Sequence, residues 1–319
     1  IQALRSLMTR EGISAFITPS TDPHSGEYVP ERWKTRRWIS GFTGSAGTAV
    51  VTLDSAAIWT DSRYFIQAAE QLNGTGILLM KEKIEGTPTI AEWLGDILHR
   101  GDTVAVDGWA NTAAEVEELE NELKAYGLKL RTDIDPYAEI WKDRPSIPQS
   151  KAFTQSLEYA GESAASKLAR IRQQIGSNAI VLSMLEEVAW TLNLRANDVE
   201  NTPFMLGYVV VTPEKALLYI CKEKLTPAIE EYLKGEGVSI REYEEIATDL
   251  HELDMPVYAQ PNKTNYAVYS AIKNPIRKDS PVAKMLIFKN ETEIKCFRSA
   301  MEKDGAAMVK WMKWVVPAV

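Results

Sequence analysis

Histidine and cysteine are scarce in this chain of 319 residues, which contains three histidines and two cysteines. His24, His99 and His251 lie far apart, and none has the spacing of a familiar metal site: the sequence after His251 lacks the second imidazole of an HExxH motif. Cys221 and Cys296 form neither a CxxC pair nor a disulfide framework, which favours a reducing, cytoplasmic compartment. No GxSxG nucleophile motif is present. We therefore expect neither a catalytic residue nor a metal ligand in this chain.

The sequence also lacks an excess of positive charge and long apolar runs. Asp and Glu total 44 against 36 Lys and Arg, a formal net charge of −8, so contacts to phosphates would need a local basic patch. No stretch approaches the roughly 20 apolar residues that span a membrane. Hydrophobic residues make up 45% and charged residues 25%, as in soluble globular proteins. We expect a soluble protein without a nucleic-acid or membrane partner.

The length suffices for two domains of about 150 residues each, and the hydrophobic pattern indicates two similar units. The first has strand-like runs at 13–18, 48–53, 56–60, 77–80 and 103–107, and helical periods near 4–8, 65–72 and 113–126 with another helix opened by Pro88. Residues 142–151 contain two prolines and no period, as expected of an interdomain linker.

The second unit repeats the pattern of the first. It has helices at 164–175 and 227–233 and strands at 179–183, 206–211 and 215–221, and residues 207–220 share the strand, turn and strand spacing of residues 47–60. Because hairpin-like strands mix with strands separated by helices, the pattern predicts an α/β fold with a mixed sheet flanked by helices in each unit.

The end of the chain is expected to form a short strand at 284–288 and then a long helix. Large apolar residues recur on one face of this helix: Ile294, Phe297, Met301, Met308, Trp311 and Val315. Little sequence remains for this face to pack on, and residues 315–319 are apolar without a closing element. We interpret the helix as the entrance to a third domain; the alternative is a terminal helix docked on the second domain.

The loop Gly41-Phe42-Thr43-Gly44-Ser45-Ala46-Gly47, called the glycine loop below, could approach a phosphate through its backbone. In dinucleotide and P-loop sites the glycines follow a strand and open a helix. Here the glycine loop leads into the strand at 48–53. A tight turn with close backbone contacts is therefore the favoured interpretation.

Polar and aromatic side chains gather in the loop at 22–38, which includes His24, and again after the strand at 56–60. There, Asp61 is placed to cap a helix, and Arg63 lies in the first helical turn beside Tyr64. The planar guanidinium of Arg63 suits a carboxylate or a row of peptide carbonyls. The alternative for Arg63 is a surface ion pair without a function.

Five stretches of the sequence, in the expected order, resemble the three-domain, cytosolic type of Xaa-Pro aminopeptidase, also called aminopeptidase P. They are WISGFTGSAGTAVVT at 38–52, IWTDSRYFIQAAEQL at 58–72, IWKDRP at 140–145, EEVAWTLNLRANDVENTP at 186–203 and KNETEIKCFRSAMEKDGAAMVK at 289–310. Several separate motifs at consistent spacing make this resemblance specific.

The resemblance implies two tandem creatinase/prolidase N-terminal-type domains with ribonuclease H-like mixed sheets, at 1–145 and 146–283. Residues 284–319 would begin a "pita-bread" catalytic domain, in which two metal ions, usually manganese, activate a water that cuts the bond before a penultimate proline. The resemblance assigns no metal ligand and no catalytic residue to this chain. The residue that carries over is the arginine of the TDxRY motif, Arg63, as a substrate contact, with Asp61, Tyr64 and His24 as supporting residues.

The implied partners are peptides with a penultimate proline, the protein's own C-terminal catalytic domain and a second copy in a homodimer. A second hypothesis is a creatinase-like module that has lost catalysis and binds peptides or proteins. A prolidase or creatinase is disfavoured, because such proteins typically carry one N-terminal domain of this type.

Overall fold

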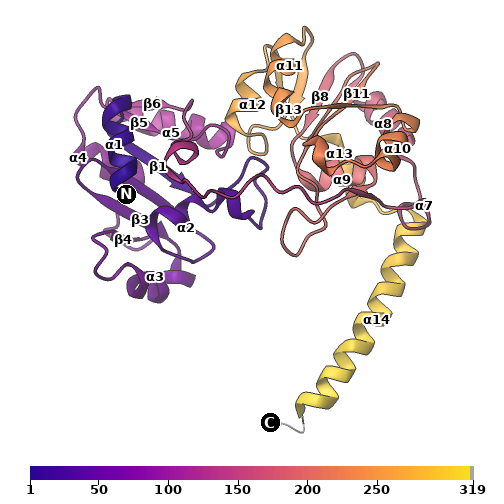
Figure 1. Cartoon of the computed structure of the whole chain (residues 1–319), viewed down its shortest axis with the longest axis horizontal. Coiled ribbons are helices and arrows are strands. Elements are labelled where there is room, and N and C mark those ends of the chain that lie inside the picture. Colours follow the sequence, from indigo (N-terminus) through magenta and orange to yellow (C-terminus); the bar gives the residue numbers. More distant parts are fainter. Residues whose placement is uncertain (317–319) are drawn as a thin grey trace.

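The computed structural model describes residues 1–316 and shows two α/β domains side by side (Figure 1). The first domain contains strands β1 (Ala15–Pro19), β2 (Thr48–Thr52), β3 (Ala56–Thr60), β4 (Leu78–Lys81), β5 (Thr103–Ala105) and β6 (Lys129–Arg131). Its helices are α1 (Gln2–Glu11), α2 (Thr35–Ser40), α3 (Phe65–Leu72), α4 (Ile90–Ile97), α5 (Ala113–Ala125) and α6 (Tyr137–Ile140).

The second domain follows after residues 142–151, which contain no helix or strand. Its strands are β7 (Phe153–Thr154), β8 (Ala179–Leu182), β9 (Leu194–Arg195), β10 (Tyr208–Val211), β11 (Ala216–Tyr219), β12 (Val238–Arg241), β13 (Val257–Ala259) and β14 (Pro275–Arg277). Its helices are α7 (Leu157–Ala160), α8 (Ala164–Ile175), α9 (Leu185–Leu192), α10 (Pro227–Gly235), α11 (Ile246–Glu252), α12 (Tyr266–Ser270) and α13 (Pro281–Ile287), and the long helix α14 (Glu291–Val315) comes last.

The two domains share one sheet topology. The strand orders are β4-β3-β2-β1-β5-β6 and β12-β11-β10-β8-β13-β14. In the first sheet β2 runs antiparallel to both of its neighbours, and in the second sheet β10 does the same. All other neighbouring strands in the two sheets are parallel. The predicted duplication and the predicted mixed sheet are therefore confirmed.

Each sheet is covered by helices on both faces because its central strands are apolar on both sides. In β1, Phe16 packs in a cluster with residues of α1 and α3, whereas Ala15 and Ile17 pack in a second cluster with residues of α4 and α5. Successive side chains of a strand point to opposite faces, so a continuous apolar run fills two core layers. The second sheet repeats this arrangement: Ile180 and Val181 of β8 lie in different clusters.

The strand predicted at 284–288 is wrong, since residues 281–287 form helix α13. Ser280 caps the helix by accepting a hydrogen bond from the backbone N–H of Val282 at 3.2 Å, and Pro281 occupies the first helical position, where its missing N–H costs nothing. A short apolar run does not distinguish a buried strand from a helical turn.

The long helix predicted after residue 289 is confirmed as α14, which begins with a capping box between Asn290 and Glu293. It projects away from the second domain (Figure 1), and no residue of it is buried. Its closest packing is on α7. The expected alternative, a terminal helix docked along the second domain, is therefore not what the structure shows. Residues 317–319 of the predicted apolar end lie outside the described residues.

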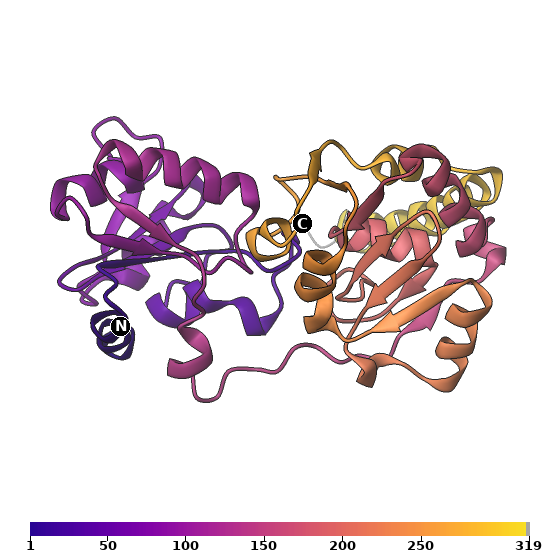
Figure 2. The same cartoon turned by 90° about the horizontal axis from the view of Figure 1, so that it is seen from above.

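The segment between the domains is held at both ends, and Figure 2 shows its course along one side of the molecule. Near its start, Arg144 is 5% exposed and donates to Asp135 at 2.5 Å and to the backbone carbonyl of Arg32 at 3.0 Å. Near its end, the hydroxyl of Ser150 donates to Asp198 of the second domain at 2.7 Å. Buried charged hydrogen bonds of this kind restrict the relative motion of the two domains.

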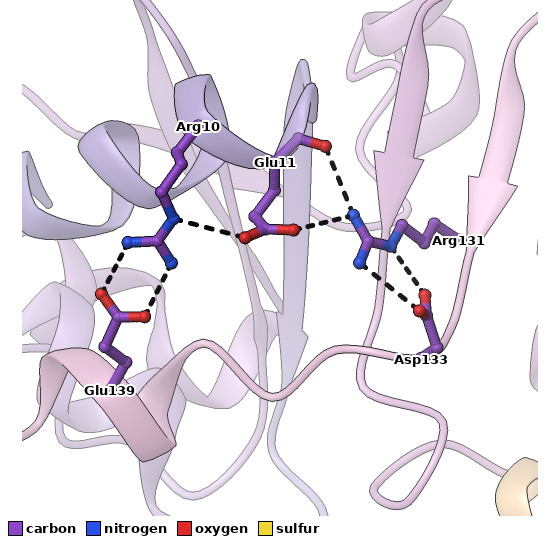
Figure 3. A network of polar contacts seen from close by, with 5 residues as sticks. All are labelled: Arg10, Glu11, Arg131, Asp133 and Glu139. Atoms are coloured by element: carbon purple, nitrogen blue, oxygen red, sulfur yellow. Dashed lines mark hydrogen bonds and ion pairs between the residues drawn. The ribbon is translucent and has the colours of Figure 1, made fainter.

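A chain of ion pairs ties α1 to β6 and α6 on the surface of the first domain (Figure 3). Arg10 pairs with Glu139 at 2.7 Å and Glu11 at 3.3 Å, and Arg131 pairs with Asp133 at 2.7 Å and Glu11 at 3.3 Å. All these side chains are at least 30% exposed. Exposed pairs of this kind contribute about 0 to 1 kcal/mol each, so the network is a structural surface contact.

Candidate functional site

Asp61 and Arg63 form a bidentate ion pair just after the end of β3. Asp61 caps the short helical turn before α3, because its Oδ1 atom accepts the backbone N–H of Arg63 at 3.0 Å. The guanidinium of Arg63 turns back to the same carboxylate, with Nε 2.9 Å from Oδ1 and Nη2 2.7 Å from Oδ2. The Arg63 side chain is 65% exposed. The hydrogen bonds from Arg63 lower the pKa of Asp61 to about 2, so Asp61 stays ionised at neutral pH.

This pair bears on both interpretations of Arg63. The surface ion pair that the alternative anticipates is present, yet it leaves Nη1 of Arg63 without a hydrogen bond among residues 1–316. A guanidinium has five N–H donors, and Asp61 fixes its plane while the Nη1 donors stay accessible. The geometry therefore allows Arg63 to donate to a carboxylate or a peptide carbonyl.

Tyr64 connects the Asp61–Arg63 pair to the glycine loop. Its hydroxyl lies 2.5 Å from the hydroxyl of Ser45, and its ring contacts Phe42 edge-on at a centroid distance of 6.1 Å. The guanidinium carbon of Arg63 lies 5.1 Å from the centroid of the same ring. Three of the four residues predicted for the site, Asp61, Arg63 and Tyr64, thus lie together.

The glycine loop is a tight turn, as predicted. A Cβ atom at Gly44 would lie 2.3 Å from the ring of Phe42 and 2.8 Å from the ring of Tyr64. A Cβ atom at Gly47, whose φ is +149°, would lie 2.7 Å from the carbonyl oxygen of Trp59. Only glycine fits at these two positions, and its role there is close packing of the loop on β3 and Tyr64.

His24, the fourth predicted residue, lies at the contact between the domains. It is fully buried; its Nδ1 atom lies 2.8 Å from the carbonyl oxygen of Ser183 and its Nε2 atom 2.9 Å from the hydroxyl of Tyr243. Its ring packs on Tyr208 at a centroid distance of 4.4 Å. Burial lowers the pKa of His24 to about 4, so the imidazole is neutral at pH 7. His24 therefore joins the two domains and has no accessible donor for a ligand.

Backbone groups add to this domain contact. The first N–H groups of α5, at Ala113 and Ala114, donate to the carbonyls of Thr264 and Pro261 at 3.0 and 2.9 Å. Tyr266 returns a hydrogen bond to the carbonyl of Asn111 at 2.8 Å. These N–H groups have no partner inside their own helix, so the second domain completes the start of α5. No local pattern could indicate the partners of His24, because they lie more than 150 residues away in the sequence.

A buried ion pair joins the stretch 186–203 of the second domain to the short turn at 222–224. Lys224 and Asp198 are 2.5 Å apart, and both side chains are fully buried. Asp198 also accepts hydrogen bonds from the Ser150 hydroxyl at 2.7 Å and from the Leu206 N–H at 2.8 Å. A buried carboxylate needs this many donors. Asp198 therefore ties the linker to the core of the second domain.

No group of three or more His, Cys, Asp or Glu side chains among residues 1–316 is arranged to hold a metal ion. Within the same residues, no helix has the length and apolar character needed to cross a membrane.

The sequence matches the Creatinase/Prolidase N-terminal domain family twice, at residues 1–136 and 143–293. Aminopeptidase P2 of Arabidopsis thaliana is 36% identical over an aligned region of 357 residues, gaps included. The aligned region covers 99% of this chain and 50% of that protein. The probable Xaa-Pro aminopeptidase P of Sordaria macrospora is 37% identical over 336 residues, covering 99% of this chain and 54% of that protein.

Among solved structures, X-prolyl aminopeptidase from Caenorhabditis elegans is similar, with a TM-score of 0.88 and 30% sequence identity. The similarity covers 95% of this chain and 52% of that protein, which is described as a cytosolic enzyme with a di-nuclear active site. This chain thus spans about half the length of the relatives it matches.

Proposed function

Because the chain belongs to the creatinase/prolidase N-terminal domain family and is a homologue of the Xaa-Pro aminopeptidases P, we propose that it forms the N-terminal region of such a peptidase. The complete protein would remove the N-terminal residue from peptides with proline in second position. This region would shape the access of the peptide and the assembly of the enzyme, without carrying out the chemistry.

The observation that supports this proposal most strongly is the similarity of both domains, in their relative arrangement, to one half of an X-prolyl aminopeptidase. A TM-score of 0.88 over 95% of the chain covers both domains at once. The buried contacts of His24 with the second domain, and the hydrogen bond from Ser150 of the linker to Asp198, supply a physical reason for a fixed arrangement. A rigid two-domain body can hold one wall of a peptide cleft in place.

The proposed enzyme would use two manganese ions. Residues 1–316 do not fit such a centre, since their acidic and imidazole groups do not cluster, and we assign no step of a metal-dependent reaction to them. What this chain would supply is binding: Arg63, oriented by Asp61, would donate through Nη1 to a carbonyl or carboxylate of the peptide.

We further propose that the complete protein is cytoplasmic and forms a homodimer. The two cysteines are free, as expected in a reducing compartment, and the similar Caenorhabditis elegans protein is described as cytosolic. The apolar face of α14 would be covered by the protein's own catalytic domain.

The test is an assay of the complete protein with manganese, using the peptides Ala-Pro-Ala and Ala-Ala-Ala. We expect release of the first alanine from Ala-Pro-Ala alone, and no release by the 319-residue chain by itself. Binding of Ala-Pro-Ala by the complete protein without turnover would replace this proposal by a peptide-binding module. Turnover by the 319-residue chain would contradict the assignment of the chemistry to another part of the protein.

A further inference from the structure

A cavity of about 210 Å³ lies beside the glycine loop. We call it the loop cavity. Its lining includes Trp33 and Lys34 from the segment that leads into α2, Arg36 and Arg37 from α2 itself, Gly44 from the glycine loop and Glu200 from the second domain. The loop cavity thus lies where the two domains meet.

Arg36 is a buried cation without a carboxylate partner. The residue is 5% exposed, and its Nε and Nη1 atoms donate to the Ser20 hydroxyl at 2.8 Å and to the Phe42 carbonyl at 2.6 Å, while Nη2 donates to the Gly44 carbonyl. No Asp or Glu among residues 1–316 forms an ion pair or hydrogen bond with it. These neutral acceptors orient the guanidinium but leave its charge uncompensated, which is costly for a buried group.

Arg37 adds a second cation to the same cavity. It is exposed, and its side chain has neither a hydrogen bond nor an ion pair within the described part of the chain. Burial and the neighbouring charge of Arg37 lower the pKa of Arg36 to about 10. Two adjacent positive charges without a carboxylate partner form a site that an anion would stabilise.

The charge of the lining indicates what kind of anion fits. Lys34 already pairs with Glu31, whereas Arg36 and Arg37 have no carboxylate partner among residues 1–316, and Glu27 and Glu200 lie in the same lining. The two glutamates repel a phosphate dianion more strongly than a carboxylate monoanion, so a carboxylate fits the two arginines better. We propose that the loop cavity binds a carboxylate group and that Arg37 is one of its ligands.

The carboxylate that we assign to this site is the free C-terminus of a short peptide, a choice that rests on the proposed function. The size of the loop cavity suits a carboxylate with one adjoining residue, and Trp33 and Tyr28 give it an apolar wall. A peptide anchored there by its C-terminus would be bound in a defined direction.

The test is binding of peptides to the 319-residue chain by calorimetry, which needs no turnover and so does not depend on catalysis. The probes are Ala-Pro-Ala, the same peptide with an amidated C-terminus, acetate and inorganic phosphate. The variant is Arg37→Ala, because replacing Arg36 would also release the glycine loop. Lys129→Ala, which removes an exposed lysine of β6, is the matched control.

We expect Ala-Pro-Ala to bind, and both amidation and Arg37→Ala to weaken binding by about 10-fold or more, the effect of losing a charged hydrogen bond. Lys129→Ala should bind like the unaltered chain. Acetate should compete with Ala-Pro-Ala, whereas phosphate should not. Absence of binding, equal binding of acid and amide, unchanged binding by Arg37→Ala, or tighter binding of phosphate would each overturn the proposal.

Discussion

The Nε2 atom of His24 lies 2.9 Å from the hydroxyl oxygen of Tyr243, although 219 residues separate the two in the sequence. His24 belongs to a loop of the first domain and Tyr243 to the second, and both are buried. A loop that enters another domain and finds hydrogen-bond partners there fixes the position of both. This contact, together with the linker, fixes the position of the two domains relative to each other.

Tyr243→Phe should destabilise the chain without changing its fold. The substitution leaves the Nε2 atom of His24 buried without a partner, which costs about 1 to 3 kcal/mol. Urea unfolding measures this loss. Tyr159→Phe is the control, because Tyr159 is 51% exposed and should tolerate the change. Equal stability of the two variants would show that the hydrogen bond to His24 contributes nothing.

The His24 contact should weaken in acid. The folded chain has a His24 pKa of about 4, against about 6.5 in an unfolded chain, so the unfolded state binds more protons between these values and stability falls as the pH drops through this range. Burial raises the pKa of Asp107 and of Glu187 to about 7, which acts in the opposite direction.

The difference in unfolding free energy between the unaltered chain and His24→Phe isolates the histidine. It should shrink by about 2 to 3 kcal/mol between pH 7 and pH 4.5. A difference that stays constant over this range would contradict a buried neutral imidazole.

Lys224→Met should be far more damaging than Lys222→Met, although both lysines lie in the same short turn. Lys224 is fully buried against Asp198, whereas the Lys222 side chain is 56% exposed and pairs with Glu242. Removing one partner of a buried pair costs about 3 to 5 kcal/mol, and an exposed pair contributes about 0 to 1 kcal/mol. Thermal and urea unfolding of the two variants measure these losses. Similar losses of stability in the two variants would contradict a structural role for the buried pair.

Gly161→Ala should destabilise the N-terminal end of α14, where Asn290 caps the helix. A Cβ atom at Gly161 would lie 2.6 Å from Oδ1 of Asn290, the residue that caps α14 and donates to the Ala160 carbonyl at 2.9 Å. Gly12→Ala is the matched control: both glycines follow a helix in the left-handed conformation, with φ of +69° and +67°, but nothing lies within 4 Å of a Cβ at Gly12. Hydrogen exchange of the first amides of α14 should accelerate in Gly161→Ala and not in the control. Equal exchange rates in both variants would contradict the role of the contact between Gly161 and Asn290.

Elements with a strong local pattern were predicted well from the sequence. The strand at 56–60 has the predicted bounds, and helix α8 has its predicted range 164–175, because apolar residues at the right spacing also form the cores of the domains. The edge strand β6 was not predicted, since its three residues, Lys129–Arg131, carry no alternation that a sequence reader could detect.

The site was predicted only as far as it is local. Asp61, Arg63 and Tyr64 are neighbours in the sequence, and the helix-start signal at Asp61 predicted its cap. The burial of His24 depends on Ser183 and Tyr243, and the burial of Arg36 on carbonyl groups of the glycine loop. Such contacts arise from tertiary packing, which local patterns do not encode.

The central claim is that this region takes part in peptide turnover by an Xaa-Pro aminopeptidase, and the kinetics of Arg63→Ala in the complete protein test it most directly. Losing a charged hydrogen bond of about 1.5 to 3 kcal/mol should lower kcat/KM for Ala-Pro-Ala by about 10- to 150-fold, with little change in unfolding. Arg170→Ala, which removes another exposed and ion-paired arginine, should leave kcat/KM unchanged. Equal kcat/KM for Arg63→Ala and the unaltered protein, across peptides of different lengths, would contradict the account.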